Sequence, residues 1–189
     1  MKDLIVFLAN GFEEVEALTM VDFCRRAGIE VDTVSIYTSL EVKGAHGVVV
    51  LADKKLSEIN MDDYKGIFIP GGLPGAENLR DKKEVVMGLR RFAEEGKLTA
   101  AICAGPGALD RAGILKEDRF TCYPGYEGNI ETQGPLDEIV VKEGNVITGM
   151  GPALAMDTAF AIIEHFKGEE TLRQIKEEVL YHRLEKEFQ

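Results

Sequence analysis

The chain has 189 residues, of which 45% are hydrophobic and 29% charged, a balance that is ordinary for a globular protein and argues against intrinsic disorder. Its formal net charge of −11 disfavours nucleic acid and anionic membranes as partners, because no basic cluster offsets the acidic excess. No apolar stretch approaches the roughly 20 residues of a transmembrane helix, and the N-terminus turns acidic too early for a secretory signal. Three cysteines without zinc-binding spacing favour free thiols in a reducing compartment, so we expect a cytoplasmic protein.

Strand-like and helical segments alternate along the chain. Short apolar runs predict strands at 4–9, 31–36, 48–51, 66–70 and 98–103. Helical periodicity predicts helices at 13–27, 83–95, 106–112 and 152–166. Runs such as Ile67-Phe68-Ile69 are apolar at every position, which is typical of a parallel sheet covered by helices on both faces.

The last third of the chain departs from this alternation. Segments 139–141 and 146–148 flank a turn and predict a hairpin. Lys167-Gly168 predicts a helix end, and the segment 169–189 then places Leu172, Ile175, Val179, Leu184 and Phe188 at helical spacing. This apolar stripe fits either a cover for the core or an interface. With no repeat and no linker, we expect one α/β domain over residues 1–189.

Three glycine-rich or acidic turns follow predicted strands, at 10–16, 70–75 and 103–106. Ligands of open α/β sheets bind beyond the carboxyl ends of the strands. The sequence therefore predicts that these turns converge on one site.

Cys103 is the strongest candidate within that site. It stands between a predicted buried strand and a helix that begins at Pro106, in a turn of small residues. A free thiol has a pKa near ~8.5, and a helix N-terminus favours the thiolate. This placement suits a nucleophile or redox sensor, although a buried structural cysteine has to be weighed against it. Cys24 fits core packing, and Cys122 fits packing or a place next to the site.

Glu16 is the candidate partner of the thiol. It lies in the first turn of a predicted helix, between Val15 and Ala17, and is expected to point at the sheet ends. Two neighbouring acids cannot both be charged at low cost, so one of Glu16 and Cys103 keeps a proton and the pair titrates together. A protonated Glu16 can donate to the sulfur and act as general acid or base.

Backbone groups complete the predicted site. The N–H groups of Gly71, Gly72 and Ala104 can form an oxyanion hole opposite the sulfur, although Gly-Gly alone also fits a simple turn. His46 lies on a glycine-flanked loop, where an exposed role and a place at a site shared between subunits both stay open. No histidine is spaced to pair with Cys103, so a protease-type dyad is not predicted.

Several motifs in the same order along the chain extend this picture. Ala101-Ile102-Cys103-Ala104-Gly105-Pro106, with Ile69-Pro70-Gly71-Gly72 and Gly11-Phe12-Glu13-Glu14-Val15-Glu16, resembles the ThiJ/PfpI superfamily, in the DJ-one-like branch of the parkinsonism-associated deglycase. The resemblance implies a flavodoxin-like three-layer sandwich with a mostly parallel sheet, of the class I glutamine-amidotransferase-like type. It also implies a homodimer, an oxidisable Cys103 hydrogen-bonded to a protonated Glu16, and backbone donors at Gly71, Gly72 and Ala104.

Some positions depart from the family pattern. Ala104 stands where the peptidase branch has a histidine, which makes a peptidase an unlikely assignment. Tyr123 stands where the deglycase branch often has a histidine, and Met150 and His46 stand where arginines are expected. These changes remove an imidazole and fixed positive charge, so Tyr123, His46 and Cys122 are retained as candidate neighbours of the site.

Two functions follow from these residues. The first is a glyoxalase or deglycase-like enzyme that acts on small dicarbonyls such as methylglyoxal, through Cys103 and Glu16, without metal or organic cofactor. The alternative is a stress sensor or chaperone that works through oxidation of Cys103 to the sulfinate. A scaffold with an inert cysteine is a third interpretation.

Overall fold

A seven-stranded sheet forms the middle layer of the structure, a computed structural model that describes residues 2–187. In spatial order its strands are β5 (Lys54–Lys55), β2 (Val31–Ser35), β1 (Lys2–Leu8), β6 (Tyr64–Ile69), β7 (Leu98–Ile102), β9 (Val146–Gly149) and β8 (Val140–Glu143). All neighbours pair in parallel except β8 and β9, which form the predicted hairpin. The mostly parallel sheet is confirmed.

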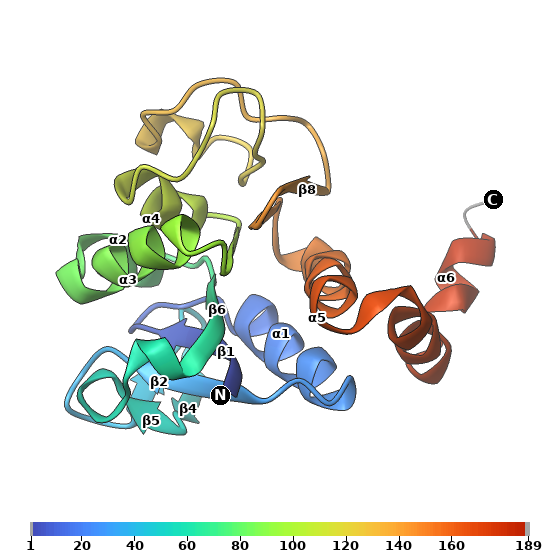
Figure 1. The fold of residues 1–189 in the computed structure, drawn as a ribbon, viewed down its shortest axis with the longest axis horizontal. Helices are drawn as coiled ribbons and strands as arrows, with labels where there is room; N and C mark the ends of the chain where they lie inside the picture. Colours follow the sequence, from blue (N-terminus) through green and yellow to red (C-terminus); the bar gives the residue numbers. More distant parts are fainter. Residues whose placement is uncertain (1, 188–189) are drawn as a thin grey trace.

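Helices cover both faces of this sheet (Figure 1). The helices α1 (Glu14–Arg26) and α5 (Ala155–Glu178) pack on one face, and α2 (Gly75–Asp81), α3 (Lys83–Glu94) and α4 (Pro106–Arg111) pack on the other. Along β1, Leu4 and Val6 belong to the first core, whereas Ile5 and Phe7 belong to the second. Side chains alternate across a strand, so a strand buried on both faces must be apolar throughout, as its sequence is. Short 3-10 turns occur at Leu56–Glu58, Met61–Asp63, Glu127–Asn129 and Pro152–Leu154.

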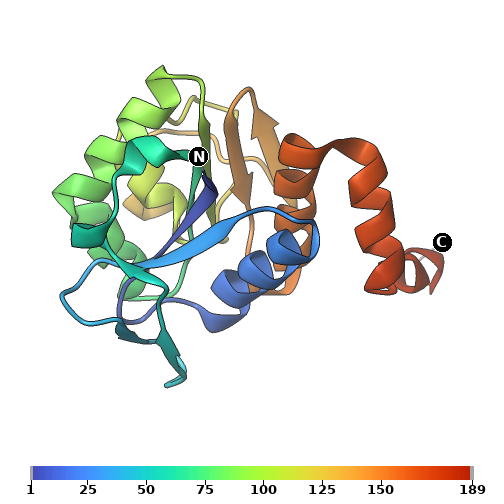
Figure 2. The same ribbon diagram turned by 60° about the horizontal axis from the view of Figure 1, so that its bottom comes forward.

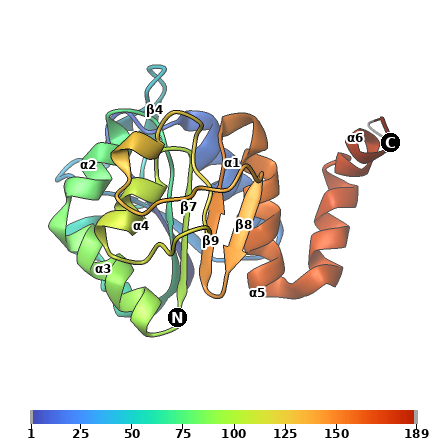
Figure 3. The same ribbon diagram turned by 90° about the horizontal axis from the view of Figure 1, so that it is seen from above.

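The strand predicted at 48–51 does not join this sheet. Instead β4 (Val49–Leu51) pairs antiparallel with β3 (Glu41–Lys43), and the resulting β3–β4 ribbon protrudes from the body of the sandwich (Figure 3). Val49 and Leu51 are exposed, while Val42 of β3 is buried in the core under α1. An apolar run predicts a strand but does not identify its partner. The strand-like run Phe120-Thr121-Cys122-Tyr123 is likewise not a strand, and its backbone is irregular.

The C-terminal segment begins as predicted and then differs. Gly168, with φ 79°, interrupts the regular geometry of α5, which confirms the predicted helix end. A single helix over 169–189 is wrong, because Leu180 adopts φ 62° and a separate α6 (Tyr181–Glu187) follows. Ile175 is buried and Tyr181 stacks edge-on against Phe160 with ring centroids 4.7 Å apart, so this segment adds to the core beside α1.

Figure 2 shows the C-terminal segment bending away from the sheet after Gly168 and then descending beside the sandwich. Leu184 is exposed, and Phe188 lies outside the described residues. Among residues 2–187, none of the helices combines the length and the apolar character that crossing a bilayer requires.

Candidate active site

Three loops meet at the carboxyl ends of β1, β6 and β7, which are adjacent in the sheet. The N–H of Glu13, in the loop after β1, donates to the carbonyl of Gly71, after β6, at 2.9 Å. A Cβ added to Gly71 would lie 2.6 Å from Cβ of Cys103, which follows β7. The structure thus brings the three predicted turns together at one edge of the sheet.

Cys103 occupies a strained corner between β7 and α4. Its φ of 64° lies in the left-handed region, which a side chain other than glycine occupies at a cost of about 1–3 kcal/mol. Two backbone hydrogen bonds hold it there, from its N–H to the Gly149 carbonyl at 3.0 Å and from the Tyr123 N–H to its own carbonyl at 2.9 Å. The side chain of Cys103 is half-buried. The turn after it leaves no room for a larger residue at Gly105, since a Cβ there would lie 2.5 Å from the Ile69 carbonyl oxygen.

Glu16 is fully buried in the first turn of α1 and lies against Cys103. Its Oε2 accepts a 2.7 Å hydrogen bond from the N–H of Gly71, and its buried Oε1 has no hydrogen-bond partner among residues 2–187. Burial raises the pKa of Glu16 to about 7, while the Gly71 N–H and the Cys103 thiol oppose that rise. This raised pKa agrees with the expected role as a proton carrier near neutral pH.

The thiol is not in the environment that the sequence predicts. Burial, followed by the charge of Glu16, raises the pKa of Cys103 instead of lowering it. The reason is that burial of the thiol and the carboxyl of Glu16 beside it outweigh the N-terminus of the short helix α4. Both pKa values are raised, so the pair loses its first proton near pH 7, and the singly charged pair then shares the remaining proton between the sulfur and the carboxyl.

Two of the three predicted backbone donors, those of Gly72 and Ala104, lie near the sulfur, and the third does not. The N–H groups of Ala104 and Gly72 lie near the Cys103 sulfur and oppose the rise in its pKa. The N–H of Gly71 is directed at Glu16 instead, so it positions the carboxyl. A Cβ on Gly71 would also lie 2.7 Å from Oε2 of Glu16, and only glycine allows this approach.

Two of the three candidate neighbours lie in the loop beside Cys103. The backbone N–H of Tyr123 donates a hydrogen bond to the carbonyl of Cys103, but the side chain of Tyr123 is exposed and lies next to Gly151. Cys122 is buried in a small apolar cluster with Ala104 and Phe120, and burial raises the pKa of its thiol to about 11. Cys122 is therefore a packing residue, as is the fully buried Cys24.

The third candidate neighbour, His46, contacts Glu13 and Glu14 at the start of α1. Its Nδ1 lies 3.0 Å from Oε2 of Glu14 and 3.5 Å from Oε1 of Glu13, and its ring is largely exposed. Glu14 itself is buried, and its Oε1 accepts the N–H groups of His46 and Val48 at 2.9 and 3.3 Å. The structure thus makes Glu14 the anchor of the loop that carries His46.

Tyr126 is a residue near the site that the sequence analysis did not single out. It packs against Ala104 in the same cluster as Cys122, and its hydroxyl is buried without a hydrogen-bond partner among the described residues. Its place after Pro124-Gly125 was the available signal, but an aromatic residue after a turn is most often only packing.

The fold and the site together define an α/β protein with a strained cysteine beside a buried carboxyl at the edge of a parallel sheet. The sequence profile of the DJ-1/PfpI family matches residues 2–165, and the chain belongs to this family. It is 35% identical over 179 residues to the Parkinson disease protein 7 homolog of Danio rerio, covering 93% of this chain and 95% of that protein.

A solved structure and a plant relative extend the comparison. The structure described as oxidized Toxoplasma gondii DJ-1 superposes with a TM-score of 0.89 at 33% identity, covering 95% of this chain and 98% of that one. The DJ-1 homolog B of Arabidopsis thaliana is 34% identical over 94% of this chain. The chain spans only 41% of the length of that plant protein. These relatives confirm the expected flavodoxin-like sandwich.

Proposed function

We propose that this chain is a cysteine-dependent glyoxalase or deglycase-like enzyme that acts on small dicarbonyls, such as methylglyoxal, or on their adducts. The observation that carries the proposal is the Glu16 carboxyl, which is buried against Cys103 with one oxygen unpartnered. A carboxyl with a pKa of about 7 exchanges protons at neutral pH in both directions. Membership of the DJ-1/PfpI family supports the same assignment.

The reaction begins with attack of the Cys103 sulfur on the aldehyde carbon of methylglyoxal. Glu16 takes the thiol proton and passes it to the aldehyde oxygen, which gives a hemithioacetal. The N–H groups of Gly72 and Ala104, which face the sulfur, stabilise the oxyanion as it forms.

Proton transfer between the two substrate carbons follows. Glu16 removes the hydrogen from the former aldehyde carbon and returns it to the neighbouring carbon, which converts the hemithioacetal into a thioester of a hydroxy acid. Water then cleaves the thioester, releasing lactate and the free thiol. The sum is addition of one water to methylglyoxal, so no external oxidant or reductant is consumed.

The first experiment is a turnover assay with methylglyoxal in which consumption and lactate are both quantified. Cys103→Ser and Glu16→Gln are each expected to lower turnover by about 10³-fold or more, because they remove the nucleophile and the proton carrier. Cys24→Ala removes a thiol that is buried in the apolar core and serves as the control. Consumption of one equivalent or less by the wild type would rule out catalysis of dicarbonyls.

A second candidate function is peroxide sensing. The N–H groups of Gly72 and Ala104 are placed to donate hydrogen bonds to sulfinate oxygens as readily as to a substrate oxyanion. Two molecules of hydrogen peroxide oxidise the thiol to the sulfinic acid and are reduced to water. Mass spectrometry tests this by a gain of about 32 Da on the Cys103 peptide after peroxide treatment. Glu16→Gln separates the functions, because an amide still donates to a sulfinate but carries no proton between carbons.

We also propose that the protein works as a homodimer whose interface includes the β3–β4 ribbon. Val48, Val49 and Leu51 of this ribbon are exposed, although they are large and apolar. Val15 and Leu18 of α1 add two more exposed apolar side chains. Apolar surface of this kind is typical of a protein interface.

A further inference from the structure

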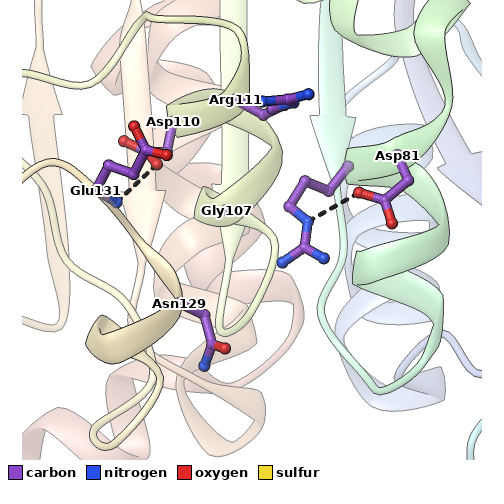
Figure 4. Close-up of a pocket in the computed structure, with 7 residues that line it drawn as sticks. Asp81, Gly107, Asp110, Arg111, Asn129 and Glu131 are labelled. Atoms are coloured by element: carbon purple, nitrogen blue, oxygen red, sulfur yellow. Dashed lines mark hydrogen bonds and ion pairs between the residues drawn. The ribbon is translucent and has the colours of Figure 1, made fainter.

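A polar cavity of about 330 Å³ lies beside α4 and does not include Cys103 in its walls. Its lining residues include Arg80 and Asp81 of α2, Gly107 and Arg111 of α4, and Glu131. Figure 4 shows Asp110 and Glu131 together on one side of the cavity and Asp81 on the other, with Gly107 and Arg111 between them. Its volume is enough for a small organic molecule.

The hydroxyl of Tyr126 lies directly behind Gly107, one of the residues that line this cavity. Tyr126 is 6% exposed, and its Oη has no hydrogen-bond partner within the described part of the chain. A Cβ built on Gly107, a lining residue, would lie 3.1 Å from Oη, and the guanidinium of Arg80, another lining residue, partly offsets the rise that burial causes in the pKa of Tyr126. A buried hydroxyl without a partner is costly, which indicates that a ligand or water completes it.

The acidic side chains of the cavity are already engaged or lie apart from Tyr126. Asp110 accepts the N–H groups of Glu131 and Thr132 and the hydroxyl of Thr132, at 2.7 to 3.1 Å. Asp81 accepts a hydrogen bond from Nε of Arg80, at 3.1 Å. Among residues 2–187, no hydrogen bond or ion pair engages the two terminal nitrogens of that guanidinium. Glu131 lies on the Asp110 side (Figure 4). The donors near Tyr126 therefore face a ligand that accepts hydrogen bonds and carries negative charge.

We propose that Arg80 and Tyr126 form a binding site for a small carboxylate, and that its ligand is the hydroxy-acid product of the reaction at Cys103. The identity of the ligand rests on the proposed function, in which a neutral dicarbonyl becomes a carboxylate. The dicarbonyl substrate carries no charge that a guanidinium can recognise, whereas the product carries a carboxylate that it can bind.

The position of the site supports this assignment. Tyr126 packs against Ala104, the residue after Cys103. Gly107, which lines the cavity, follows Ala104 by three residues, and its N–H donates to the Ala104 carbonyl. The lining of the cavity and Cys103 are therefore part of the same turn between β7 and α4. The Arg80–Tyr126 site thus takes the carboxylate next to where it forms, and it determines product affinity.

The test measures lactate binding to Cys103→Ser protein, so that it does not depend on turnover. Titration calorimetry is run with D- and L-lactate and with lactamide, a neutral molecule of similar shape. We expect lactate to bind and lactamide to bind at least about tenfold more weakly, because a charged hydrogen bond is lost. Adding Arg80→Gln is expected to weaken lactate binding about tenfold, and adding Tyr126→Phe about fivefold.

A matched control and a kinetic readout complete the experiment. Arg119→Gln removes an exposed arginine outside the cavity and controls for net charge. In the active protein, Arg80→Gln raises the inhibition constant of lactate more than the KM of methylglyoxal. The site is overturned if lactate and lactamide bind alike, or if Arg80→Gln and Tyr126→Phe bind lactate as Arg119→Gln does. Lactate binding that both variants weaken, in a protein without turnover, keeps the carboxylate site and removes the proposed enzyme function.

Discussion

At the scale of single residues, the proton shared by Cys103 and Glu16 couples the site to the stability of the protein. The pKa of Glu16 rises from 4.5 in the reference state to about 7 in the fold, mainly through burial. The folded protein therefore holds a proton that the unfolded chain releases between these two values, and the free energy of unfolding falls as pH rises through this window. The stabilisation is fully present below pH 4.5 and is lost by about pH 7.

Glu16→Gln tests this coupling, because the amide has nearly the same shape and does not ionise. Relative to the wild type, the variant is expected to gain up to about 3 kcal/mol of stability between pH 4.5 and 8, and each kcal/mol is worth about 2–4 °C in Tm. Thermal melts of both proteins across this pH range measure it. A difference in Tm that stays constant with pH would show that Glu16 does not change its ionisation there.

Gly71→Ala tests how tightly the residues of the site are packed. The added methyl group would meet Cβ of Cys103 at 2.6 Å and Oε2 of Glu16 at 2.7 Å, so the pair must separate. We expect turnover to fall by about 10²-fold or more, because a misplacement of 1 Å is enough for such a loss. Gly128→Ala is the matched control, since a Cβ there meets nothing within 4 Å. Equal activity in the two variants would contradict the close packing.

At the scale of elements, Glu14 holds the loop between β3 and β4 against the start of α1. One carboxylate oxygen accepts the N–H groups of His46 and Val48, and a Cβ on Gly44 would collide with the same carboxylate. Removing the anchor by Glu14→Ala is expected to speed hydrogen exchange at these two amides by about tenfold or more, since each loses its acceptor. Exchange in β1 and β6 serves as the internal reference. Unchanged exchange at both amides would show that the ribbon is held by other contacts.

Some elements of the fold and the site can be predicted from the sequence, and others cannot. The central strands are recognisable because burial on both faces requires apolar residues at every position, as in Ile67-Phe68-Ile69. The β3–β4 ribbon is not, because strand pairing depends on distant contacts such as that of Glu14. Cys103 and Glu16 are recognisable as a pair from their turns, but the direction of the thiol pKa is not, since it depends on how deeply both are buried. Tyr126 was missed because only the fold reveals that its hydroxyl lacks a partner.

At the scale of the whole molecule, the large exposed side chains of the β3–β4 ribbon and α1 test the proposed homodimer. Leu51 is the most exposed of these apolar residues at 69% and pairs with Glu41 at the end of the ribbon away from its turn. A chain with a net charge of −11 repels a second copy, so apolar contact has to supply the attraction.

Leu51→Glu removes apolar area and adds one more negative charge at the proposed interface. Sedimentation is expected to give the variant a mass near 20.8 kDa, while the wild type sediments at about twice that value. Met87→Glu is the control, because Met87 is 61% exposed on α3, on the opposite face of the sheet from α1. Since Glu14 ties the turn of the ribbon to the helix that carries Glu16, dissociation is also expected to lower turnover. A wild type that sediments as a single chain would remove the dimer and leave the ribbon as a free surface.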